Sequence, residues 1–133
     1  MSTSIPSGFE DLTQAQVATL ATIGPDGRPQ LSEVWFLYDD GVFKFSLHVD
    51  RQKTKNLRRD RAATLFVLDL QNPMRYLEVR GDAEVEPDDD YAFADRVGAK
   101  YGGVDLRKMD GDRPGRVIIT IRPVKVNARN IGG

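Results

Sequence analysis

A short basic segment has the residue types best suited to binding a charged ligand. The segment Arg51-Gln-Lys-Thr-Lys-Asn-Leu-Arg-Arg-Asp60 directly follows an alternating run, Val42-Phe-Lys-Phe-Ser-Leu-His48. This order predicts a strand that ends in a turn and leads into a helix, whose first turn presents backbone N–H groups without helical partners. The helix dipole and the nearby cations favour an anion such as phosphate there. Because the chain has a net charge of only -1, this positive charge is a local feature.

Two interpretations of this basic segment stay open. In the first it is a phosphate site, in which charge and hydrogen bonds come from Arg51, Lys53, Thr54, Lys55 and Asn56. In the second it is a solvated surface helix whose arginines pair with Asp60 and other carboxylates; these arginines are Arg58, Arg59 and Arg61. The position of the segment at a strand end, where the mouth of a barrel would lie, favours the phosphate site.

Three other features also have a functional and a structural interpretation. Ser46 and His48 lie on the less apolar face of the preceding strand, and we favour a packed or surface role for His48 over that of a catalytic base. Trp35 is the only tryptophan; core packing or a subunit contact is favoured over stacking on a ligand. The run Asp88-Asp-Asp90 could suggest a cation site, but acidic residues are typical of the first turn of a helix, which we favour.

The residue types and motifs that the sequence lacks narrow the range of reactions that the protein could catalyse. The chain has no cysteine and one histidine, so a zinc-thiolate site or a cysteine nucleophile is excluded and no metal site is expected. It contains neither a phosphate-binding Gly-x-x-x-x-Gly-Lys loop nor a Gly-x-Gly-x-x-Gly fingerprint. An enzyme this poor in acid–base side chains would most naturally take its chemistry from a cofactor.

Composition sets the broad class of protein. With 133 residues, 40% hydrophobic and 29% charged, the chain is expected to form one globular domain over 1–133, with 1–10 loose. A pI of about 5.8 argues against nucleic-acid binding. No apolar run approaches the roughly 20 residues that span a membrane. No secretory signal is recognised, so a cytoplasmic location is expected.

Alternating apolar residues and turn signals predict about seven strands and two or three short helices. The strands are expected over 17–23, 30–38, 42–48, 62–69, 75–86, 116–122 and 124–130, with a break at Pro123 and a bulge at Gly81. The first three are expected to form a meander. Helices are expected from Asp11, over 54–59 and over 88–101, and 105–115 is expected to be a polar loop. The predicted fold is mainly β: a small antiparallel β-barrel with peripheral helices.

Three segments together resemble the pyridoxamine-phosphate-oxidase-like split-barrel flavoproteins, and more narrowly the branch that uses the deazaflavin coenzyme F420. These segments are Leu20-Ala-Thr-Ile-Gly-Pro-Asp-Gly-Arg-Pro-Gln-Leu-Ser32, the basic segment 51–60, and Tyr76-Leu-Glu-Val-Arg-Gly-Asp-Ala83 followed by an acidic helix. The resemblance extends from about Leu12 to Val126. No single motif decides it, but the order and spacing of the three are specific.

The resemblance implies a homodimer with two cofactor sites at the subunit interface and a small-molecule substrate. It implies that the cofactor phosphate is held by Arg51, Lys53, Thr54, Lys55 and Asn56. It also implies that the tricyclic ring lies along Pro29, Gln30, Leu31 and Ser32, and that the strand beside the ring and ribityl chain contains Ser46, Leu47 and His48.

The function implied by the resemblance is hydride transfer between F420 and a small conjugated organic substrate. One alternative is an FMN-dependent oxidoreductase of the same fold, and another is a protein that binds flavin or F420 without turnover. Vitamin B6 oxidation is not expected, because the chain ends at 126–133 without the arginine-containing substrate motif of true pyridoxamine phosphate oxidases. A β-barrel module without a cofactor is the remaining alternative.

Overall fold

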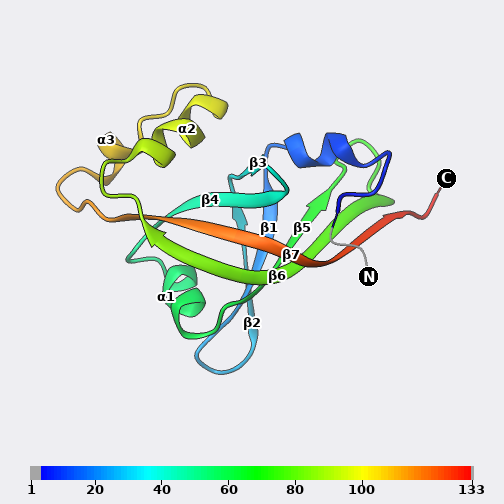
Figure 1. Ribbon diagram of the computed structural model, residues 1–133, viewed down its shortest axis with the longest axis horizontal. Helices are drawn as coiled ribbons and strands as arrows, with labels where there is room; N and C mark the ends of the chain where they lie inside the picture. The colour runs from blue at the N-terminus through cyan, green and yellow to red at the C-terminus, as the bar shows by residue number, and fades with distance from the viewer. Residues whose placement is uncertain (1–3, 133) are drawn as a thin grey trace.

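The computed structural model describes residues 4–132 and contains seven strands, three α-helices and one 3-10 helix (Figure 1). The strands are β1 (Ala18–Ile23), β2 (Pro29–Val34), β3 (Leu37–Asp39), β4 (Val42–His48), β5 (Ala62–Leu68), β6 (Arg75–Pro87) and β7 (Arg116–Asn130). The helices are η1 (Glu10–Gln14), α1 (Gln52–Arg59), α2 (Ala92–Lys100) and α3 (Leu106–Asp110).

All seven strands belong to one antiparallel sheet in the order β2-β1-β5-β6-β7-β4-β3. Its two edge strands, β2 and β3, are joined by only Trp35 and Phe36. Three Cα–Cα steps of 3.8 Å reach at most about 11 Å, so the sheet must curl until its edges approach. The edges are not hydrogen-bonded to each other in this order, and the sheet is a split barrel, as predicted.

The division between β2 and β3 corrects one prediction. Residues 30–38 were expected to form one strand in a meander with 42–48, but β2 pairs with β1 whereas β3 pairs with β4. The other neighbour of β4 is β7, so the three-strand meander is wrong. Side-chain alternation is the same on either side of the crossover, and therefore gives no sign that the chain changes its pairing partner.

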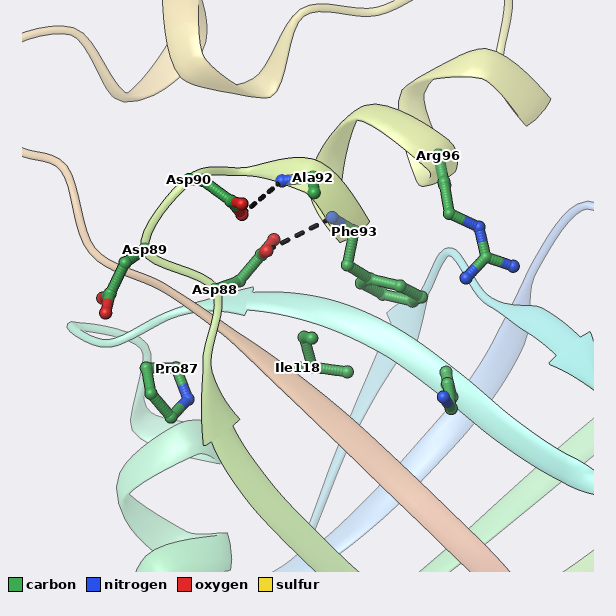
Figure 2. Close-up of a pocket in the computed structure, with 9 residues that line it drawn as sticks. Pro87, Asp88, Asp89, Asp90, Ala92, Phe93, Arg96 and Ile118 are labelled. Carbon is green, nitrogen blue, oxygen red and sulfur yellow. Dashed lines mark hydrogen bonds between the residues drawn. The ribbon is translucent and has the colours of Figure 1, made fainter.

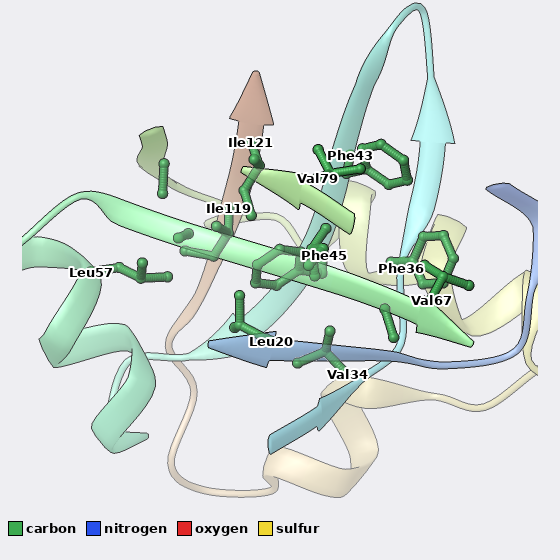
Figure 3. Packing of buried hydrophobic residues seen from close by; sticks show 14 of the residues in the cluster. Leu20, Val34, Phe36, Phe43, Phe45, Leu57, Val67, Val79, Ile119 and Ile121 are labelled. Atoms are coloured by element: carbon green, nitrogen blue, oxygen red, sulfur yellow. The ribbon is translucent and has the colours of Figure 1, made fainter. Parts of the chain in front are cut away.

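The core follows the predicted alternation in β4, where Phe43, Phe45 and Leu47 are buried and the intervening residues are partly exposed. These side chains meet Leu20 of β1 and Ile119 of β7 inside the curled sheet (Figure 3). Leu57 of α1 belongs to the same cluster, which anchors the helix of the basic segment against the sheet.

A β-bulge interrupts the pairing of the two longest strands, β6 and β7. The register shifts between Arg80 and Gly81, and Gly81 lies opposite Pro123. A Cβ atom at Gly81 would come within 2.3 Å of the Arg122 carbonyl oxygen, which explains the requirement for glycine. The bulge at Gly81 is confirmed, but the predicted break at Pro123 is wrong: β7 continues through it, because a proline without an N–H group is tolerated at a bulge.

Helices α2 and α3 lie together at one end of the molecule (Figure 1). Their apolar side chains form a second buried cluster. The expected helix over 88–101 begins later, at Ala92, and α3 forms where a polar loop was expected. A five-residue helix is too short for a periodic pattern; it is stabilised by buried Leu106 and by Asp105, whose carboxylate accepts a hydrogen bond from the Lys108 N–H group at 3.1 Å.

Near the N-terminus, Ile5 and Phe9 pack against the main core, and Arg75 lies 4.9 Å from the centroid of the Phe9 ring. The predicted loose segment 1–10 therefore has core contacts in the part that is described, whereas 1–3 lie outside the described residues. Within 4–132, no helix is both long and apolar enough to cross a membrane.

Candidate functional site

The turn between β4 and α1 is closed by its own hydrogen bonds. The Thr54 hydroxyl donates to the His48 carbonyl oxygen at 2.8 Å, and the Arg51 N–H group donates to the same oxygen at 3.1 Å. The N–H groups of Thr54 and Lys55 both donate to the Arg51 carbonyl oxygen. The N–H groups of Gln52 and Lys53 lie in the first turn of α1, where N–H groups have no helical partner and point out of the N-terminal end of the helix. The Thr54 side chain, fully buried, therefore holds the turn and is not directed to a ligand.

Lys53 is the residue of the basic segment whose surroundings are most unusual. It is only 8% exposed, and in the described part of the chain its ammonium group makes one hydrogen bond, to the Ser32 hydroxyl at 3.0 Å, and no ion pair. Burial lowers the pKa of Lys53, and the nearby Arg51 guanidinium lowers it further. A buried cation is normally paired. The site at Lys53 therefore favours an anionic ligand.

Asn56, another residue of the predicted phosphate site, is bonded inside the protein. Its side chain is fully buried, and its amide donates to the Thr22 hydroxyl at 3.0 Å and to Gln30 Oε1 at 2.6 Å. Asn56 Oδ1 accepts a hydrogen bond from Gln52 Nε2 at 2.9 Å. Because both ends of the amide are engaged inside the protein, Asn56 ties α1 to β1 and β2 and is not available to a phosphate.

A cavity of about 250 Å³ opens beside this turn, and we call it the cradle pocket. Five of the sequence-predicted residues line it: Ser46, Leu47, His48, Arg51 and Lys53. The Ser46 hydroxyl oxygen is buried and has no hydrogen-bond partner among the described residues. Because this oxygen is itself inaccessible, it could bond to a ligand only if the Ser46 side chain turned toward the cavity, where a polar ligand atom would satisfy it.

His48 lies at the pocket, but both of its ring nitrogens are engaged. Nδ1 accepts a hydrogen bond from the Asp50 N–H group at 3.1 Å, which places the proton on Nε2, and Nε2 then donates to the Arg113 carbonyl oxygen at 2.6 Å. The packed role that the sequence favoured for His48 fits these bonds. The ring holds the 111–115 loop beside the pocket and has no free nitrogen for proton transfer.

Strand β2 lies at the edge of the sheet, where it pairs only with β1. Pro29, Gln30 and Leu31 are exposed, and Leu31 retains 65% of its accessible surface. Half of the backbone N–H and C=O groups of an edge strand point away from the sheet. Two of these four predicted residues contact the basic segment: the Ser32 hydroxyl accepts a hydrogen bond from Lys53, and Gln30 Oε1 accepts one from Asn56.

The structure adds pocket residues that the sequence did not predict. Val97, Leu106, Met109 and Arg116 come from distant segments, and Trp35 joins them from the crossover between the sheet edges. Arg116 is paired with the Asp110 carboxylate at 2.8 and 2.9 Å, so its charge is neutralised. The one available signal was Trp35, for which ligand stacking was an open alternative.

The acidic run 88–90 caps a helix, as we favoured. The buried Asp88 carboxylate accepts a hydrogen bond from the Phe93 N–H group at 3.2 Å, and Asp90 accepts one from Ala92 (Figure 2). Asp88 also accepts a bond from the Ala94 N–H group at 2.9 Å. These bonds satisfy the first turn of α2. Among the described residues, no group of three His, Cys, Asp or Glu side chains could hold a metal ion.

Within residues 4–132, the arginines after the turn do not pair with carboxylates as the alternative interpretation proposed. Arg59 donates to the Ile23 carbonyl oxygen, and Arg61 donates to that of Ala83 at 2.8 Å. Arg58 is exposed and makes no ion pair within residues 4–132. Arg59 and Arg61 thus support the backbone, whereas Arg58 stays available to solvent.

Comparisons with known proteins agree with this architecture. The family described as pyridoxamine 5'-phosphate oxidase matches residues 9–130. A solved structure named F420 reductase is 38% identical, with a TM-score of 0.83, over 92% of this chain and 98% of its own. A conserved hypothetical protein from Mycobacterium tuberculosis is 27% identical, with a TM-score of 0.74, over 97% and 88% of the two chains.

A heme-binding protein from Mycobacterium smegmatis shares the fold at 23% identity and a TM-score of 0.71, with 97% of this chain and 56% of that chain covered. At that identity the likeness concerns the fold alone. The family match extends over nearly all of the described residues, and the 38% identical structure has the same fold over almost its full length. This split-barrel chain therefore belongs to the pyridoxamine 5'-phosphate oxidase family.

Proposed function

We propose that this protein is an F420-dependent reductase that binds the cofactor in the cradle pocket. The observation that carries the proposal is the buried ammonium group of Lys53, which has a hydroxyl group and no carboxylate as its partner in the described structure. A cation in this position is stabilised when an anion binds beside it. A cofactor phosphate would supply that anion.

The residues present fit such a cofactor. Lys53, Arg51 and the first-turn N–H groups of α1 would hold the phosphate. After a turn of its side chain, the unpartnered Ser46 hydroxyl would bond to a polar atom of the chain or ring, and the backbone of 29–32 would line the ring. When bound and reduced, F420 supplies a hydride to an electrophilic acceptor.

The protein's part in the reaction is binding, orientation and exclusion of water. His48 cannot exchange a proton without losing its bonds to Asp50 and Arg113, and Arg116 is held by Asp110. The proton that accompanies the hydride is therefore assigned to solvent. Orienting a reduced cofactor against its acceptor is by itself a large catalytic contribution.

The surface of α1 favours F420 over FMN. Arg51, Lys55 and Arg58 are spaced so that they share one face of the helix. All three are exposed and none makes an ion pair among the described residues. The polyglutamate tail of F420 continues beyond the phosphate as a chain of carboxylates, which this row of cations would attract, whereas FMN ends at its phosphate.

The test is a titration of the purified protein with F420 and, separately, with FMN, followed by the fluorescence of each. The proposal predicts micromolar or tighter binding of F420 and at least tenfold weaker binding of FMN. Preference for FMN would overturn the choice of cofactor in favour of the flavin alternative. Tight F420 binding without turnover on a broad panel of conjugated acceptors would favour the non-catalytic binding protein.

We also propose that the active form is a homodimer, as the family resemblance implies. Leu31 on the edge strand β2 and Leu70 in the turn after β5 retain 65% and 77% of their accessible surface. A subunit contact would cover exposed apolar side chains of this kind. Light scattering during size-exclusion chromatography measures the mass directly, and a monomer at micromolar concentration would contradict the proposal.

A further inference from the structure

The indole of Trp35 borders the cradle pocket, although Trp35 lies outside the turn between β4 and α1. Its ring stacks on Tyr101, with the centroids 4.3 Å apart and the planes 6° from parallel. Trp35 lines the pocket and Tyr101 does not, so the indole meets the pocket with the surface that Tyr101 leaves uncovered. That surface is substantial, because the residue is 36% exposed.

The backbone N–H and C=O groups of Phe36, the residue after Trp35, are both hydrogen-bonded to side chains at the end of α2. The Phe36 N–H group donates to the Tyr101 phenol oxygen at 3.1 Å, and that hydroxyl donates to the Gln16 carbonyl oxygen at 2.7 Å. The Lys100 ammonium donates to the Phe36 carbonyl oxygen at 2.8 Å. Lys100 and Tyr101 therefore fix the backbone of the crossover, and the stack on Tyr101 orients the indole itself.

Helices α2 and α3 add three apolar residues to the pocket that Trp35 lines, and β2 adds one carboxylate, that of Glu33, which accepts a hydrogen bond from the Thr19 hydroxyl at 2.5 Å. Val97 and Leu106 are buried members of the second cluster, and Met109 is an exposed, flexible neighbour. Aromatic and aliphatic walls of this kind select flat apolar ligands, and a stacked ring pair adds to the binding free energy beyond the area it buries. A methionine adapts to rings of different outline.

We propose that Trp35 is a specificity-determining residue that stacks on the planar conjugated ring of the substrate, and that Tyr101 is the positioning residue that presents it. This inference rests on the proposed function, because it takes the cradle pocket as the site of the reductase. It narrows the substrate class to flat, conjugated ring compounds.

The test compares 2-naphthol with its saturated analogue decahydro-2-naphthol, which has the same skeleton and hydroxyl group but no flat ring. Calorimetric titrations use the wild-type protein and the Trp35→Leu and Trp35→Phe variants, each with and without saturating oxidised F420. Trp35→Leu is expected to weaken 2-naphthol binding roughly three- to tenfold and to change decahydro-2-naphthol less than twofold. Trp35→Phe, which keeps a flat ring, is expected to restore most of the affinity.

Trp35 is the only tryptophan, so the intrinsic fluorescence of the protein reports on this side chain alone. Replacement of Tyr101 by Leu removes the stack. It is expected to shift the emission to longer wavelength and to weaken 2-naphthol binding. Thermal melts of each variant separate these effects from a loss of folding.

Equal weakening of both naphthols in Trp35→Leu, or of neither, would overturn the stacking role. A loss of F420 affinity as large as the loss for 2-naphthol would also overturn it, because Trp35 would then contact the cofactor ring. If the wild-type protein binds no F420 while Trp35→Leu still weakens 2-naphthol selectively, the proposed function fails and the ring site stands.

Discussion

Replacement of Lys53 by Met separates the binding function of this residue from any contribution to stability. Methionine keeps an unbranched side chain that fills the same space, but it removes the ammonium group that donates to Ser32. In the ligand-free protein this ammonium is buried and unpaired within the described structure, and burial lowers its pKa. We therefore expect opposite effects: weaker cofactor binding and unchanged or higher stability.

The expected magnitudes come from these contacts. A charge-assisted hydrogen bond contributes about 1.5–3 kcal/mol, so losing one from Lys53 to a phosphate weakens F420 binding roughly 10- to 150-fold. In the free protein the variant loses one hydrogen bond to a neutral hydroxyl, about 1 kcal/mol, and gains the relief of a desolvated charge, which is at least as large. The thermal midpoint should therefore stay within about 4 °C of the wild-type value or rise above it.

Fluorescence titration with F420 and thermal unfolding without ligand measure the two effects on one preparation. Lys125→Met is the matched control, because Lys125 is an exposed lysine on β7, outside the pocket. A clear loss of stability with unchanged F420 affinity would refute the reasoning, since Lys53 would then be a structural cation. The Arg51→Ala/Lys53→Ala double variant should lose several kcal/mol of binding free energy if both side chains contact the phosphate.

Three further outcomes are expected. Asp110→Asn should lower stability at pH 7 by about 2–4 kcal/mol. The hydrogen bond from Arg116 holds the pKa of Asp110 below its usual value of 3.8. The difference in stability between wild type and variant should therefore persist above pH 3.8 and shrink as the pH falls below it. Urea titrations at several pH values measure this difference, and a difference that does not change with pH would contradict the pairing. Gly81→Ala should cost about 1–3 kcal/mol, since its Cβ would approach the Arg122 carbonyl oxygen to 2.3 Å, and an unchanged urea midpoint would contradict the bulge geometry. His48→Ala should retain turnover, and complete loss of kcat with intact F420 binding would give His48 a chemical role that its hydrogen bonds do not suggest.

The local sequence pattern was sufficient to predict most of the strands and helices. Strand β4 has the predicted bounds, because Phe43, Phe45 and Leu47 alternate with polar residues and a turn follows at once. The bulge at Gly81 was also predictable, since a glycine inside a strand pattern is typical of a bulge or of a close backbone approach. The continuation of β7 through Pro123 was not, because it depends on the partner strand having its own irregularity at the same place.

One part of the candidate site was likewise predictable from the sequence, and another part was not. A charge cluster after a strand indicated the anion site, and Lys53 and Arg51 do border a pocket. The sequence could not distinguish them from Thr54 and Asn56, which lie in the same helix but turn inward. Helix spacing gives the relative direction of neighbouring side chains, but not which direction faces the core.

By itself, the sequence determined the mainly β character, the positions of most strands and turns, the local excess of positive charge and the shortage of groups for acid–base chemistry. These properties depend on residues near one another in the chain. Only the tertiary structure decided that Lys53 meets Ser32 and no carboxylate, that Trp35 crosses between the sheet edges onto Tyr101, and that α3 completes the pocket. Those contacts join residues 21 to 66 positions apart, and they exist because the sheet curls until its edge strands approach.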